Sequence, residues 1–199
     1  MELNYTFDTR QNDSQNYYYY NEGFSKEELN KIEKNVANLP WNIADTAGGD
    51  NTENRRSKVK WVPQNEDWWW LYEKLANMAV EANDANWNFD LHSLPEQIQY
   101  TEYYGTDKGH YGWHADIGPN VLSTRKISIT VQLSEADEYE GGDLQLFRGG
   151  NYEKGEFDTA YRGAGSVFIF PSYILHRVTP VTKGTRKSFV LWLGGGHYR

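Results

Sequence analysis

The clearest pattern of hydrophobic and polar positions in the chain is the strict alternation over residues 126–133. Because successive side chains of a β-strand point to opposite faces, this alternation predicts a strand with one apolar and one polar face. The apolar face consists of Ile127, Ile129, Val131 and Leu133, and the polar face consists of Ser128, Thr130 and Gln132.

A spacing of three to four residues predicts two helices in the first half of the chain. Ser25 and Glu28 form a capping box, and Pro40 ends the apolar pattern that follows them. The second helix is expected to begin near Asn65 or Asp67, and we interpret its apolar stripe as core packing. The apolar positions are Leu29, Ile32, Val36 and Leu39 in the first helix, and Trp69, Tyr72, Leu75, Met78, Ala79 and Ala82 in the second.

Two segments of the first half carry less regular patterns. The run from Tyr17 to Tyr20 predicts a strand at the margin of a sheet, with an aggregation-prone edge as the alternative. Residues 44–58 are polar and contain glycine, which is typical of a mobile loop. One hypothesis is that this loop, with Arg55 and Arg56, forms a lid over a substrate.

After residue 97 the pattern changes to short strands separated by glycine pairs. Helices followed by many short strands predict an α+β fold with a double-sheet β core. We expect a single domain over residues 1–199, with a helix-rich supporting part in 1–95 and the β core in 96–199. Besides 126–133, the expected strands are 98–104, 143–147, 166–170, 174–179 and 187–193.

Composition and charge narrow the classes of function. The hydrophobic content of 38% and aromatic content of 16% favour a packed globular protein over a disordered one. A net charge of -8 disfavours a nucleic-acid-binding surface. With no cysteine there is no disulfide, Cys-zinc site or iron–sulfur cluster, which fits a reducing compartment such as the cytoplasm. The first residues lack the basic and apolar regions of a signal peptide, and no apolar run is long enough for a membrane span.

Candidate chemistry gathers around three residues. In an extended segment His114 and Asp116 present an imidazole and a carboxylate on the same face, and His176 follows an apolar stretch that predicts another strand. Two histidines and one carboxylate match the facial triad of non-haem Fe(II) oxygenases, which leaves three coordination positions open. From these residues alone, structural histidines and a zinc- or manganese-dependent cupin-like site remain open alternatives.

The sequence segments around these residues resemble those of a known family. They occur in order and at the family's spacing: 99–103, 111–116, 129–134, 139–144, 170–173 and 175–181. From about Tyr18 to Leu193 the chain resembles the prolyl-4-hydroxylase-like, PKHD-type branch of the 2-oxoglutarate- and Fe(II)-dependent dioxygenases. The resemblance implies a double-stranded β-helix (jelly-roll) core backed by the N-terminal helices.

The resemblance also implies roles for individual residues. It places Fe(II) on His114, Asp116 and His176, which would be both the metal ligands and the catalytic centre, and the distal carboxylate of 2-oxoglutarate on Arg186. A planar guanidinium suits that task because it can meet a carboxylate with two parallel hydrogen bonds.

Three further residues are expected to contact the co-substrate: Tyr103, with Tyr104 as the alternative in an uncertain register, and Ser188 and Thr130. Gln132 departs from the family, because some relatives carry a co-substrate-binding tyrosine at this position. That departure shifts the expected contacts towards Thr130 and Ser188.

The activity implied is the hydroxylation of a prolyl or other peptidyl residue, with O2 consumed and succinate and CO2 released. Ascorbate is expected as a reductant. One alternative is hydroxylation of a free amino acid or other small metabolite. Two others are a non-catalytic, metal-binding jelly roll and a cupin-like enzyme; the intact Arg186 argues against a purely structural metal. No nucleic-acid or membrane partner is expected.

Overall fold

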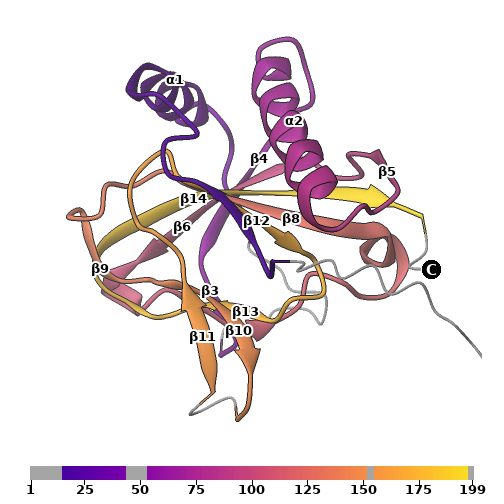
Figure 1. The fold of residues 1–199 in the computed structure, drawn as a ribbon. Coiled ribbons are helices and arrows are strands. Elements are labelled where there is room, and N and C mark those ends of the chain that lie inside the picture. The colour runs from indigo at the N-terminus through magenta and orange to yellow at the C-terminus, as the bar shows by residue number, and fades with distance from the viewer. Residues whose placement is uncertain (1–14, 44–52, 152–154, 197–199) are drawn as a thin grey trace, which may run out of the picture.

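The computed structural model describes residues 15–43, 53–151 and 155–196. In these ranges its α-helices are α1 (Lys26–Val36) and α2 (Trp69–Asn86), which lie on the same side of a large antiparallel sheet (Figure 1). Two short 3-10 helices cover Gly105–Asp107 and Asn120–Thr124. The capping box forms as predicted: Ser25 Oγ accepts from the Glu28 N–H, and the Glu28 carboxylate accepts from the Ser25 N–H. No helix in the described ranges is both long and apolar enough to cross a membrane.

The large sheet has nine strands, seven of them in the order β1-β12-β8-β14-β6-β4-β2, while β5 and β9 pair with β14. The long β14 (Val181–Gly195) lies between β8 and β6 and therefore joins the two halves of the sheet. Its other strands are β1 (Tyr18–Tyr20), β2 (Asn42–Ile43), β4 (Lys58–Val62), β5 (Leu91–Ser93), β6 (Ile98–Tyr104), β8 (Arg125–Gln132), β9 (Tyr139–Gly141) and β12 (Val167–Pro171).

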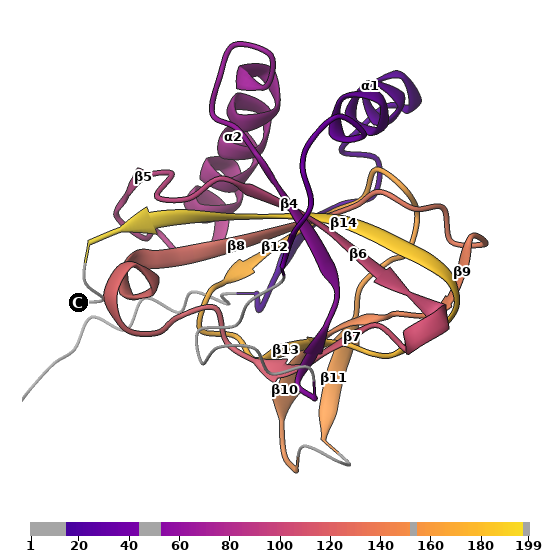
Figure 2. The ribbon, with the colours of Figure 1, turned by 180° about the vertical axis from the view of Figure 1, so that it is seen from behind.

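A smaller, five-stranded sheet lies on the side of the large sheet opposite the helices (Figures 1 and 2). Its order is β11-β10-β13-β7-β3, from β11 (Glu156–Thr159), β10 (Leu144–Gly149), β13 (His176–Val178), β7 (His110–His114) and β3 (Arg55–Arg56). Two facing antiparallel sheets, one of them covered by helices, form the predicted α+β jelly roll.

The two faces of β8 separate the hydrophobic core from the interior between the sheets. Ile127, Ile129 and Val131 are fully buried in a core cluster that also contains residues of α1 and α2. The polar face points the other way, so that Ser128 bonds to Asp116 and Thr130 lines a cavity. The alternation over residues 126–133 therefore separates the residues of β8 that pack in the core from those that face the cavity.

Several boundaries differ from the sequence-based predictions. Residues 55–56, within the predicted 44–58 loop, form β3, because the backbones of Arg55 and Arg56 pair with Tyr111 and His110 of β7. Residues 44–52, the rest of the proposed lid, lie outside the described residues. The second helix starts at Trp69, later than expected, and Trp69 itself is 52% exposed rather than part of the core. The tyrosine run forms β1 at the margin of the large sheet, as predicted.

Tyr72 ties α2 to the large sheet and gives a test of this packing. Its buried hydroxyl donates to the Val62 carbonyl at 2.7 Å and accepts from the Ile98 N–H at 2.8 Å. Tyr72→Phe leaves both backbone groups without a partner, so we expect the free energy of unfolding to fall by about 1–3 kcal/mol. Urea denaturation measures it. The control Tyr19→Phe, at an exposed position in β1, should change it by less than about 0.5 kcal/mol. Equal effects of the two substitutions would contradict the proposed role of the hydroxyl.

Candidate metal centre and its cavity

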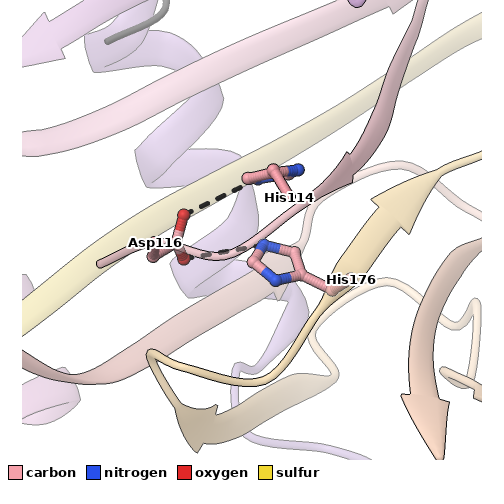
Figure 3. Close-up of side chains that lie close together, drawn as sticks. All are labelled: His114, Asp116 and His176. Atoms are coloured by element: carbon pink, nitrogen blue, oxygen red, sulfur yellow. Dashed lines mark ion pairs between the residues drawn. The ribbon is translucent and has the colours of Figure 1, made fainter. Parts of the chain in front are cut away.

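Three side chains converge from two paired strands of the small sheet. His114 ends β7, Asp116 follows two residues later, and His176 begins β13, directly opposite His114 in the antiparallel pair. Asp116 Oδ1 lies 3.6 Å from His114 Nε2, and Asp116 Oδ2 lies 3.5 Å from His176 Nε2. Figure 3 shows the three groups pointing towards one another, and one possible ligand atom from each lies within 4.8 Å of the other two.

Backbone carbonyls fix the orientation of both imidazoles. His114 Nδ1 lies 2.9 Å from the Gly112 carbonyl, and His176 Nδ1 lies 2.9 Å from the Ile174 carbonyl. Because a carbonyl only accepts, each Nδ1 carries a hydrogen, and Nε2 is the ring nitrogen that faces Asp116 and has the lone pair when the imidazole is neutral. A neutral imidazole oriented by such a hydrogen bond is the usual form of a histidine that binds a metal.

Burial and neighbouring charges also shift the pKa values of His114 and Asp116 in directions that favour binding of a cation. Burial, followed by the proximity of His176, lowers the pKa of His114, which favours the neutral imidazole. Burial opposes ionisation of Asp116, but the positive charge that His176 and His114 carry when protonated, together with the hydrogen bond from Ser128, holds the pKa of its carboxyl below the usual value. The site therefore favours a positive charge beside the carboxylate, and a divalent metal ion can supply that charge in place of the two protons. Two imidazole nitrogens and one carboxylate are a donor set that fits Fe(II) and other divalent transition metals.

Neighbouring residues hold Asp116 in place. Ser128 Oγ donates to Asp116 Oδ2 at 2.6 Å, and Ser172 Oγ lies 3.0 Å from Ser128 Oγ. Arg125 Nη1 donates to the backbone carbonyl of Asp116 at 3.1 Å. The same guanidinium makes two 2.6 Å hydrogen bonds to Glu96 and lies 3.7 Å above the ring of Trp192. The strand end that carries the carboxylate is thus tied to both β8 and β14.

A cavity of about 280 Å³ extends from this centre into the interior between the sheets. Arg186, only 2% exposed, lies in its wall, with Nη1 3.3 Å from Ser188 Oγ and its guanidinium 5.5 Å above the ring of Tyr103. Within the described ranges, no carboxylate of the protein forms an ion pair with Arg186. A buried guanidinium is costly without a compensating anion, so the cavity is suited to an anionic ligand.

The structure places the remaining candidate residues as follows. Tyr103, Thr130 and Ser188 line the cavity with Arg186. Tyr104 points away from it, because its hydroxyl donates to Glu102 on the outer face of β6. Of the two tyrosines, Tyr103 is the one that lines the cavity, and its contact with a co-substrate stays a prediction. Gln132 lies in a smaller cavity that shares Arg186 and Thr130 with the first.

Sequence reasoning missed several residues that line or support the cavity. Ser128 could have been found, because it shares the polar face of β8 with Thr130. Glu96, Gln99 and Arg125 lie within or close to the motif segments, but no pattern in the sequence marks them as lining a cavity. Trp192 reaches the cavity through the pairing of β14 with β8. Arg55, which the sequence placed in a possible lid, lines the cavity from β3.

Comparisons with known proteins point to one family. The family model described as the 2OG-Fe(II) oxygenase superfamily matches residues 98–194. A PKHD-type hydroxylase of Synechococcus sp. (strain CC9605) is 31% identical over 157 residues, which cover 78% of this chain and 67% of that protein. A PKHD-type hydroxylase of Rippkaea orientalis is 29% identical over 178 residues, which cover 87% of this chain and 76% of the relative.

The fold is shared with solved structures of lower sequence identity. A prolyl hydroxylase from Trichoplax adhaerens, in complex with a hypoxia inducible factor peptide fragment, superposes with a TM-score of 0.71. The two sequences are 15% identical, and the match covers 90% of this chain and 84% of the other. At this identity the comparison establishes the architecture only.

The hydrogen bond from Ser128 to Asp116 gives a test of the metal centre. Ser128→Ala removes the donor that orients the carboxylate, so we expect the affinity for Fe(II) to fall about 10–100-fold without loss of folding. Anaerobic calorimetric titration measures this affinity. His176→Ala should abolish high-affinity binding, and Ser123→Ala, at an exposed serine, should leave it unchanged. Native affinity in Ser128→Ala would show that the hydrogen bond does not position the ligand.

Proposed function

This chain belongs to the 2OG-Fe(II) oxygenase superfamily, in the branch of PKHD-type hydroxylases, and from this membership we propose that it hydroxylates a peptidyl substrate. As a member it is an Fe(II)- and 2-oxoglutarate-dependent dioxygenase. We assign the iron to His114, Asp116 and His176. This assignment is supported by their convergence and by the free Nε2 lone pair of each histidine.

The single observation that supports the co-substrate site best is the buried guanidinium of Arg186. It lies in the same cavity as the three ligand residues, and no carboxylate from the described chain compensates its charge. In our proposal the distal carboxylate of 2-oxoglutarate takes that place. The opposite end of the oxo acid then faces the metal centre.

Other residues of the cavity would complete the binding of the co-substrate. The hydroxyls of Tyr103, Thr130 and Ser188 offer donors around Arg186. Fixing both ends of the oxo acid holds its reactive end in one orientation, which lowers the entropic part of the barrier. Iron with 2-oxoglutarate and O2 supplies the oxidising chemistry, in which the oxo acid becomes succinate and CO2 while the substrate gains a hydroxyl group. The chain itself provides orientation and exclusion of water.

The prime substrate is proposed from two features. The relatives that match the chain are PKHD-type hydroxylases, and apolar residues line the same cavity as the metal centre. Trp61, Ile117 and Leu122 are among the apolar residues of the lining, which suit the ring of a prolyl residue. Arg55 and Glu96 also line the cavity, and such charges would suit a free amino acid, which is therefore the second candidate.

Family membership favours the oxygenase over a non-catalytic jelly roll and over a cupin-like enzyme.

Substitution of Arg186 tests the co-substrate site. Anaerobic addition of Fe(II) and 2-oxoglutarate should give a weak visible charge-transfer band in the native protein. In Arg186→Ala we expect the concentration of 2-oxoglutarate at half-saturation to rise about 100-fold or more, because a buried ion pair is lost. Lys183→Ala, at a side chain that is 75% exposed, serves as the control and should behave as native. A normal half-saturation in Arg186→Ala would refute the assignment.

The class of prime substrate is tested by turnover. We expect proline-containing peptides to raise the rate of succinate formation above the rate without substrate, and the product peptide to gain one oxygen atom in its mass. Matched peptides with alanine in place of proline should have no such effect. If free amino acids stimulate succinate formation and peptides do not, the second candidate replaces the first. Ascorbate dependence, a prediction from the resemblance, is measured in the same assay.

A further inference from the structure

A second, smaller cavity adjoins the first at Arg186, and none of the three ligand residues lines it. Thr130, Leu144 and Arg186 belong to the walls of both cavities. The remaining walls of the small cavity include Gln132, Tyr139 and Arg162. The end of the co-substrate site is therefore closed by polar side chains from β8, β9 and the segment before β12.

Gln132 and Tyr139 form a directed pair in this cavity. Gln132 Nε2 donates to the Tyr139 hydroxyl oxygen at 3.0 Å. Because an amide N–H only donates, the tyrosine accepts this bond and keeps its own hydrogen for another acceptor. The tyrosine is 3% exposed, and among the described residues no acceptor receives that hydrogen. A buried hydroxyl in this state calls for an acceptor from outside the protein.

Tyr139 and Arg186 meet directly above Gly142. A Cβ atom on Gly142 would lie 3.1 Å from Arg186 Cδ and 3.2 Å from Tyr139 Cε2. The positive φ of Gly142, +66°, and the absence of a side chain allow both groups to approach the same point. The phenol ring and the guanidinium stem are thus neighbours at the closed end of the co-substrate site.

Arg162 fixes the ring from the other side. Its Nη2 donates to the Tyr139 carbonyl at 2.6 Å, and its guanidinium lies 4.2 Å above the ring. The cation adds positive potential at this end of the site and restricts the ring to one position. The hydroxyl therefore presents its hydrogen in a pre-formed direction.

We propose that Tyr139, oriented by Gln132, donates a hydrogen bond to the distal carboxylate of the oxo-acid co-substrate and sets the length of dicarboxylate that the site accepts. This inference rests on the proposed function, because it assumes that Arg186 binds the same carboxylate. It explains how the chain functions with Gln132 where some relatives carry a tyrosine: the hydroxyl comes from β9 instead, and the glutamine directs it.

The test is an anaerobic titration of the Fe(II)-loaded protein with 2-oxoglutarate and with 2-oxoadipate, which is one methylene longer. The charge-transfer band reports binding without turnover. In Tyr139→Phe we expect the dissociation constant for 2-oxoglutarate to rise about tenfold, the typical loss for a hydrogen bond to a charged group. The constant for 2-oxoadipate should rise much less, so that the preference for the shorter acid falls.

Control variants separate this role from a structural one. Tyr100→Phe removes the hydroxyl of another buried tyrosine, one that bonds to Glu102 outside the cavity, and should leave both constants unchanged. Gln132→Met keeps the Tyr139 hydroxyl but removes the amide that directs it. It should raise the dissociation constant for 2-oxoglutarate by a smaller factor than Tyr139→Phe does. If Tyr139→Phe does not fold, Gln132→Met decides the question.

Two results would overturn the inference while leaving the proposed function intact. One is native affinity for 2-oxoglutarate in Tyr139→Phe, or in Gln132→Met where that variant decides. The other is an equal loss for both dicarboxylates, which would indicate a general disturbance of the site. If the native protein binds neither acid, the proposed function itself fails, and the inference fails with it.

Discussion

The structure depends on the compensation of charge in a buried space. Asp116 and the Nε2 lone pairs of His114 and His176 face one another at one end of a cavity, and the guanidinium of Arg186 lies in its wall. Asp116 accepts a hydrogen bond from Ser128 and Arg186 donates one to Ser188, but no described carboxylate forms an ion pair with Arg186. The low dielectric of the interior strengthens the interaction of each charge with a ligand of opposite charge. In our proposal, a divalent cation at one end and a dicarboxylate that reaches the other compensate both charges. The electrostatics of this chain therefore suit the metal and the co-substrate of the family.

The two sheets supply different side chains to this site. The large sheet buries one face against the helices, and its other face supplies Ser128, Thr130, Arg186 and Ser188 to the cavity. The small sheet supplies both histidines through the pairing of β7 with β13. The side chains from the large sheet sit on strands whose opposite face is packed in the core with the helices, so their positions are fixed before any ligand arrives.

The sequence predicted much of this, but only where the information is local. Alternation over residues 126–133 indicated both faces of β8, and the spacing of His114 and Asp116 indicated that they share a face. The pairing of His176 with His114 is a long-range register that periodicity does not contain. The sequence pattern therefore offered His176 only as a candidate, and the resemblance implied its role as a ligand. β3 was missed because Arg55 and Arg56 have no strand-like pattern and are extended through their pairing with β7. The contribution of Tyr139 was hidden for the same reason, since only the folded chain brings its ring beside Arg186.

The most direct test of the account is an anaerobic crystal structure of the protein with Fe(II) and 2-oxoglutarate. The account predicts one metal ion bonded to Nε2 of His114, Nε2 of His176 and the carboxylate of Asp116, with the oxo acid in the same cavity and its distal carboxylate hydrogen-bonded to Arg186. A metal bound elsewhere, or an oxo acid whose distal carboxylate does not contact Arg186, would contradict it.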